Sequence, residues 1–202
     1  MNTIMKKLNR LSFATLVAFL FFALAANAQK IDVYKGKISA LKGVKSFTTE
    51  YDYSDMKVGK KTESKYVSEK VKDKNKEERG TGDKWKEDWF GNREARFEPK
   101  FEELFNEYHE GGKIEDGGEV KMLIHTTMTE PGFNVGVARR PALIFLDIEF
   151  QDASGKTLCK VRIDKAPGGG AMGYDFDMAY RIQEGYAKAA KSLAKYMNKK
   201  VK

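Results

Sequence analysis

Cysteine and histidine are scarce in this sequence. Among 202 residues there are one cysteine, Cys159, and two histidines, His109 and His125. A lone cysteine cannot form an intramolecular disulfide, so stability must come from the hydrophobic core. Cys159 falls on the apolar side of a predicted strand, which favours a small buried side chain over a nucleophile. The histidines lack the i, i+4 spacing and the nearby cysteine of zinc sites, so we predict no metal site and no cofactor.

Motifs of the common enzyme classes are also missing. There is no G-x-S-x-G and no cysteine beside a plausible base. Gly168, Gly170 and Gly173 form a literal G-x-G-x-x-G before a predicted helix, but Asp175 and Asp177 at the start of that helix would repel a pyrophosphate. We therefore predict no catalytic residues and a protein that is not an enzyme. A hydrolase assembled from distant residues stays open as a further alternative.

Long runs of one charge sign do not occur. The formal net charge is +8, and lysines alternate with acidic residues, as in residues 69–79. Such mixing is typical of a solvated helix face. A nucleic-acid partner would require a stripe of one sign with exposed aromatic residues, so none is predicted.

The amino terminus has the pattern of a secretory signal. Lys6, Lys7 and Arg10 precede an apolar run over residues 13–26, and an A-x-A cleavage pattern ends at Ala28. The apolar run is short for a membrane span. We expect a signal over 1–28, a single domain over 29–202 with no transmembrane segment, and a periplasmic or secreted location. Removing the signal leaves 34 basic and 29 acidic residues, a net charge of +5.

Two strands joined by a tight turn are predicted over residues 141–163. The first strand alternates, with Leu143 and Phe145 beginning a face that continues as Asp147 and Glu149. The turn contains Gly155, which tolerates positive φ. The opposite face is wholly apolar and should be buried; its residues are Ala142, Ile144, Leu146, Ile148 and Phe150.

Further patterns predict strands over 44–53 and 120–129, a helix over 62–79, a second helical segment carrying Trp85 and Trp89, an aromatic helix over 97–108 and a long terminal helix over 179–197. Residues 30–39 fit either an edge strand or a loose arm. The predicted fold class is α/β (α+β), a two-layer sandwich. Its sheet should be mostly antiparallel with four or five strands, and the helices, including the long C-terminal helix, should pack on one face.

The last third of the chain resembles a group of small bacterial periplasmic and outer-membrane-associated domains that includes relatives of the curli-assembly lipoprotein. The resemblance rests on glycines and arginines over 132–140, the turn over 152–158, the glycines at 168–170 and the alanine-rich closing helix. It implies an antiparallel sheet with packed helices and a role in envelope assembly or transport. The chain lacks the lipidated cysteine of the lipoprotein members.

These observations lead to two hypotheses about binding. In the first, the chain is a non-enzymatic envelope protein that binds another envelope component or a second copy of itself, through Leu143 and Phe145 on the otherwise polar strand face. In the second, it binds a small ligand or lipid in a pocket of helical aromatic residues, namely Trp85, Trp89, Phe101 and Phe105. Arg139 and Arg140 could grip a carboxylate or phosphate, although a solvated loop or strand edge is the commoner setting.

Overall fold

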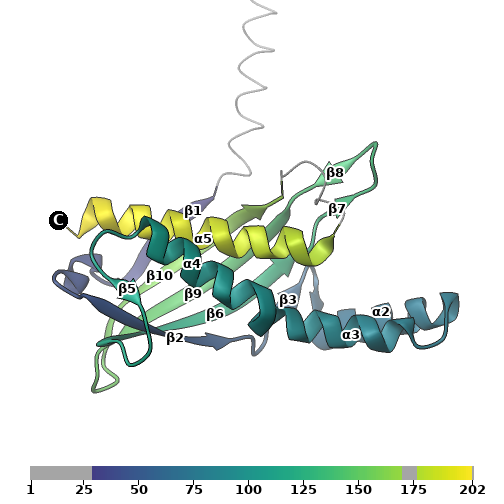
Figure 1. The fold of residues 1–202 in the computed structure, drawn as a ribbon, viewed down its shortest axis with the longest axis horizontal. Helices are drawn as coiled ribbons and strands as arrows, with labels where there is room; N and C mark the ends of the chain where they lie inside the picture. The colour runs from purple at the N-terminus through teal and green to yellow at the C-terminus, as the bar shows by residue number, and fades with distance from the viewer. Residues whose placement is uncertain (1–28, 170–176, 202) are drawn as a thin grey trace, which may run out of the picture.

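The computed structural model describes residues 29–169 and 177–201. Its main element is a sheet of eight strands in the order β1-β10-β9-β6-β2-β5, with β3 paired to β6 and β4 paired to β3 (Figure 1). The strands are β1 Lys30–Gly36, β2 Ser46–Asp52, β3 Lys57–Val58, β4 Lys61–Thr62, β5 Lys113–Ile114, β6 Val120–Glu130, β9 Ala142–Gln151 and β10 Thr157–Gly168. The predicted signal over 1–28 lies outside the described residues.

The predicted hairpin is confirmed as β9 and β10. They pair antiparallel, and the turn is closed by the Asp152 carboxylate, which accepts a hydrogen bond from the Ser154 backbone N–H at 2.9 Å. Gly155 has φ +81°. The five apolar residues predicted to face inward are completely buried. Residues 30–36 form an edge strand, β1, on β10.

The predicted sheet of four or five mostly antiparallel strands is wrong. The sheet is mixed, because β2 runs parallel to both β6 and β5, and β3 also runs parallel to β6. Parallel neighbours require a long crossover, and here helices connect β2 and β3 to β6. The strands β3, β4 and β5 have two residues each, too few for an alternating pattern to reveal.

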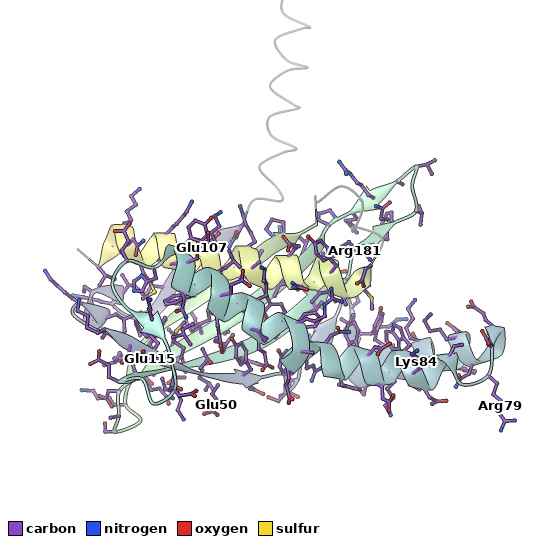
Figure 2. The ribbon with its side chains drawn as sticks, viewed as in Figure 1. Glu50, Arg79, Lys84, Glu107, Glu115 and Arg181 are labelled. Atoms are coloured by element: carbon purple, nitrogen blue, oxygen red, sulfur yellow. The ribbon has the colours of Figure 1, made fainter. Side chains whose placement is uncertain are left out.

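The helices and helical turns are η1 Ile38–Leu41, α2 Glu63–Glu77, α3 Thr81–Asn92, the π-helical turn η2 Arg93–Phe97, α4 Glu98–Tyr108 and α5 Met178–Lys200. Segments α3, η2 and α4 follow one another without a break. Figure 1 shows α4 and α5 lying across one face of the sheet, while α2 and α3 extend past its end. We call α2 and α3 the helical arm; its tip lies near Arg79 and Lys84 (Figure 2).

The core lies between the sheet and α5. Ile182, Tyr186, Leu193 and Met197 are buried at helical spacing on α5, as the sequence predicts. A side chain at Gly185 would place its Cβ 2.4 Å from the Ile144 side chain, so glycine is needed where helix and sheet approach. Cys159 is buried here, as predicted, and burial raises the pKa of its thiol to about 11.

A second, two-stranded sheet stands apart from the main one. It consists of β7 Phe133–Asn134 and β8 Arg139–Arg140, which pair antiparallel. Figure 1 shows this hairpin projecting beyond the end of the main sheet. It occupies the glycine-rich connection between β6 and β9.

Candidate functional site: an aromatic groove beside the helical arm

A groove of about 590 Å³ lies between the helical arm and the first turns of α5. A volume of this size falls in the range of small-ligand sites. The groove combines aromatic, cationic and acidic side chains from α2, α3, η2 and α5. Its lining is Lys70, Lys74, Trp85, Asp88, Trp89, Asn92, Arg96, Phe97, Asp177, Met178, Ala179 and Ile182. We call it the aromatic groove.

Three aromatic rings of the helical arm pack against one another beside the groove. Trp85 and Trp89 stand four residues apart on α3, so they share one helix face, and their rings stack with centroids 5.5 Å apart. Tyr66 from α2 packs against both, at 6.0 Å from Trp85 and 5.4 Å from Trp89. Trp89 is only 6% exposed, whereas Trp85 is half-buried. Trp85 therefore offers ring surface to the groove, and Trp89 supports it from below.

Trp89 is fixed at the junction of the arm and the sheet. Its indole Nε1 donates a hydrogen bond to Glu63 Oε1 at 2.6 Å, and the same carboxylate pairs with Arg93. The side chains of Glu63 and Arg93 are 16% and 17% exposed, so their ion pair is largely shielded from water. The Arg93 guanidinium also lies 4.1 Å from the centroid of the Tyr53 ring. These contacts hold α3 in a defined position where it meets η2.

The charged rim of the groove is only partly neutralised. Arg96 pairs with Asp177 at 3.1 Å and donates to Gln183 at 3.0 Å. Lys70 and Lys74 project from successive turns of α2 and have no ion-pair partner among the described residues. The groove also contains the Asp88 carboxylate, so its lining of three cations and two carboxylates carries one excess positive charge. An excess positive charge beside an aromatic face attracts an anion.

Asp177 has a structural role in the rim of the groove. Burial raises the pKa of its carboxyl, but hydrogen bonds from Arg96 and from the Ala179 backbone N–H outweigh burial, and the net pKa lies below its usual value. Asp177 caps the amino terminus of α5. It therefore stays ionised and holds Arg96 in place, which leaves the two lysines as the cations open to a ligand.

A polar chain lies beneath the groove, between α4 and the sheet. Tyr53 donates to Glu98 Oε1 at 3.1 Å. Tyr186 lines the same small space as Tyr53, and its hydroxyl lies 2.7 Å from that of Thr126. Burial raises the pKa of Glu98 and raises that of Tyr186 to about 12. The space among these groups is about 10 Å³, which is too small to admit a substrate. We assign these groups to the packing of α4 and α5 on the sheet.

The predicted aromatic pocket needs correction at two residues. Phe101 and Phe105 are completely buried between α4 and the sheet and do not line the groove. They follow a helical stripe, and such stripes fill cores. Trp85 and Trp89 do lie together at the groove. The sequence interpretation missed Tyr66, Lys70 and Lys74, although their i, i+4, i+8 spacing already places them on one face of α2.

Leu143 and Phe145 do not line the groove and lie on the face of the sheet opposite α4 and α5. Both are half-buried. No described helix packs on this face, and paired charges cover much of it. Arg162 donates two hydrogen bonds of 2.8 Å to Asp147, and Lys160 pairs with Glu149.

Arg139 and Arg140 form the exposed strand β8 of the projecting hairpin. They are separate from both the aromatic groove and the half-buried pair on the open sheet face. The glycines of the literal G-x-G-x-x-G begin at the end of β10 with Gly168, while Gly170 and Gly173 lie outside the described residues.

The two histidines lie on opposite sides of the sheet. His109 follows α4, packs on Phe47 and Phe105, and hydrogen-bonds Asn198 at 2.8 Å; burial lowers its pKa. His125 lies on the open face, 2.8 Å from the Ser54 carbonyl. Among residues 29–169 and 177–201, no group of three or more His, Cys, Asp or Glu side chains is arranged to hold a metal ion. No described helix is both long and apolar enough to cross a membrane.

No protein-family model and no curated protein matches this chain. Among solved structures, it is similar to PelC from Paraburkholderia phytofirmans, crystallised as a dodecamer in two space groups, once as a point variant. The identities are 11% and 12%, the TM-score is 0.40 in both cases, and the matches cover 83% of this chain and 98% of the PelC chain. At this TM-score the similarity assigns neither a fold nor a function.

Proposed function

We propose that this chain is an exported, non-enzymatic protein of the cell envelope that binds a ring-bearing anionic ligand in the aromatic groove. One observation carries the proposal: the half-exposed Trp85 ring stands beside Lys70 and Lys74, which have no ion-pair partner among the described residues. An indole face stacks on a flat ring or on the apolar face of a sugar, and the lysines attract its acidic group. Acidic saccharides and aromatic carboxylates share this chemistry.

The proposed location rests on the sequence. The basic start, the apolar run over 13–26 and the cleavage pattern ending at Ala28 are those of a secretory signal. In the periplasm or outside the cell, the ligand would come from envelope material or from the medium.

Ligand binding is tested with the mature protein purified from cells that express the full chain. Uronic acid oligosaccharides, neutral oligosaccharides of the same length and aromatic carboxylates are titrated while tryptophan fluorescence and binding heat are measured. We expect one anionic class to bind and its neutral counterpart to bind at least tenfold more weakly. Trp85→Ala should weaken binding roughly tenfold or more, because it removes the stacking surface.

A matched pair of double variants separates the groove from general charge. Lys70→Gln with Lys74→Gln should abolish the preference for the anionic ligand. Lys65→Gln with Lys72→Gln removes two exposed lysines of the same helix that do not line the groove, and should leave binding unchanged. Equal loss in both double variants, or binding that survives Trp85→Ala, would contradict the proposal.

The helix-free face of the sheet favours a second candidate function, binding of an envelope protein or of a second copy of the chain. Leu143 and Phe145 are half-buried on that face with no described helix over them. Apolar side chains among paired charges are the composition of a modest protein interface. Phe145→Asp should abolish association detected by crosslinking in cells while the purified protein keeps its melting temperature. A protein that fails to fold would instead assign Phe145 to the core.

A further inference from the structure

The β7–β8 hairpin exposes apolar side chains to solvent, one from strand β7 and two from its turn. Phe133 is 44% exposed, Val135 is 65% exposed and Val137 is 100% exposed. Five large hydrophobic residues are exposed among those the structure describes, and three of them fall within residues 133–137. Scattered exposed apolar residues need no explanation, but a cluster of them on one projecting hairpin indicates contact with an apolar partner or with a membrane.

The hairpin combines this tip with positive charge. Arg139 and Arg140 follow the tip directly and are both exposed. No acidic residue occurs from residue 131 to residue 140, although acidic residues are interleaved with basic ones elsewhere in the chain. At the rise of a β-strand, Arg139 and Arg140 stand about 7 and 10 Å from Val137 along the chain. These distances match the depth of about 5–10 Å to which apolar side chains of interfacial segments insert below the lipid headgroups.

The base of the hairpin is hydrogen-bonded to α5. Arg181, which is 4% exposed, donates from Nε to the Pro131 carbonyl at 3.1 Å and from Nη2 to the Gly132 carbonyl at 3.5 Å (Figure 2). Gly132 has φ +63°, and a Cβ there would lie 2.3 Å from the Arg140 carbonyl oxygen, so only glycine lets the two strands approach.

The turn of the hairpin is equally defined. The Val135 backbone N–H donates to the Ala138 carbonyl at 3.0 Å, and the Gly136 N–H donates to the Asn134 side chain at 3.0 Å. A buried arginine and a closed turn therefore hold the apolar tip away from the core. Because the loop is already ordered, less conformational entropy is lost when a partner binds.

We propose that the β7–β8 hairpin is a membrane-surface anchor, in which Val135 and Val137 insert at the headgroup boundary of an anionic bilayer while Arg139 and Arg140 pair with lipid phosphates. A convex tip of small aliphatic residues backed by two arginines fits a lipid surface better than a flat protein interface, which is built on larger buried anchors. The anchor is independent of the aromatic groove and adds to the proposed function.

The test is flotation of the mature protein, purified from cells that express the full chain, with vesicles of equal parts phosphatidylcholine and phosphatidylglycerol, and with vesicles of phosphatidylcholine alone. We expect binding to the anionic vesicles at low salt. Val135→Ser with Val137→Ser should reduce the partition coefficient at least tenfold. Arg139→Gln with Arg140→Gln should reduce it roughly 25-fold, since each arginine near an anionic surface contributes about fivefold.

Two controls use exposed residues elsewhere in the molecule. Tyr34→Ser removes an exposed ring on β1, and Lys199→Gln with Lys200→Gln removes two cations at the end of α5; both variants should bind like the wild type. All substitutions are at exposed sites, so unchanged melting temperatures verify folding. Absence of binding by the wild type, equal binding to neutral vesicles, or wild-type binding by either hairpin variant would overturn the proposal.

Discussion

The sheet with α5 and the helical arm bury their side chains to very different extents. The inward faces of β9 and α5 are almost completely excluded from solvent, whereas α2 and α3 bury only Val67, Gly82 and Trp89. A Cβ at Gly82 would lie 2.3 Å from the Val71 carbonyl oxygen, so the two arm helices touch through their backbones. The comparison shows why the groove lies beside the arm: a thin layer of two helices leaves aromatic surface that no second layer covers.

The largest expected effect is in the sheet. Phe150→Ala removes a completely buried ring that packs edge-on against Phe47 with centroids 6.1 Å apart. Loss of a buried phenylalanine costs about 3–5 kcal/mol because a cavity remains. Urea unfolding followed by circular dichroism should show the loss for the whole molecule. Destabilisation below about 1 kcal/mol would mean that the sheet is not the stable part of the protein.

A smaller effect is expected where the arm joins the sheet. Glu63→Ala leaves the Trp89 N–H and the Arg93 guanidinium without their shared partner, which should cost about 2 kcal/mol. Tryptophan fluorescence should shift to longer wavelength, since Trp89 becomes hydrated. Glu69→Ala on the same helix is the control; it removes only an exposed pair with Lys61 and should leave the unfolding midpoint unchanged. Similar losses in both variants would refute a special role for the junction.

The smallest expected effect concerns pH. Burial lowers the pKa of His109, so the unfolded chain takes up a proton before the folded protein does. The contribution of neutral His109 to stability is complete above its ordinary pKa of about 6.5 and is lost as the pH falls through the lowered pKa. His109→Gln should therefore flatten the decline in unfolding free energy between pH 7.5 and 5. An identical decline in the variant would show that His109 ionises equally well in both states.

The sequence predicted the elements that have regular periods. Alternation over 141–163 was sufficient to predict β9 and β10, because a strand buried on one face has an apolar residue at every second position. A helical stripe over 179–197 was sufficient to predict α5, because a helix buried on one face has apolar residues at every third or fourth position. The spacing of Trp85 and Trp89 likewise placed both rings on one face. The same reasoning failed at β3, β4 and β5, since a two-residue strand has no period.

The relative direction of neighbouring strands was the main feature that the sequence predicted wrongly. The helical segments between β2 and β6 formed a crossover long enough for parallel pairing, but alternation within a strand is the same for both directions. The groove likewise could not be predicted from local sequence patterns. Arg96 and Asp177 are 81 residues apart in the sequence and meet only because α5 packs beside η2.

The sequence by itself determined which residues of β9 and α5 are buried, because local periodicity and side-chain hydrophobicity suffice where the period is unbroken. In β6 a register shift between Thr126 and Met128 breaks the period, so Thr126 and Thr129 are buried and Met128 is only half-buried. The tertiary structure decided the mixed sheet, the union of α2, α3 and α5 around the groove, and the anchoring of the hairpin base by Arg181. Each of these depends on contacts between residues distant in the chain. Such contacts form when whole faces pack together, and no local pattern records their partner.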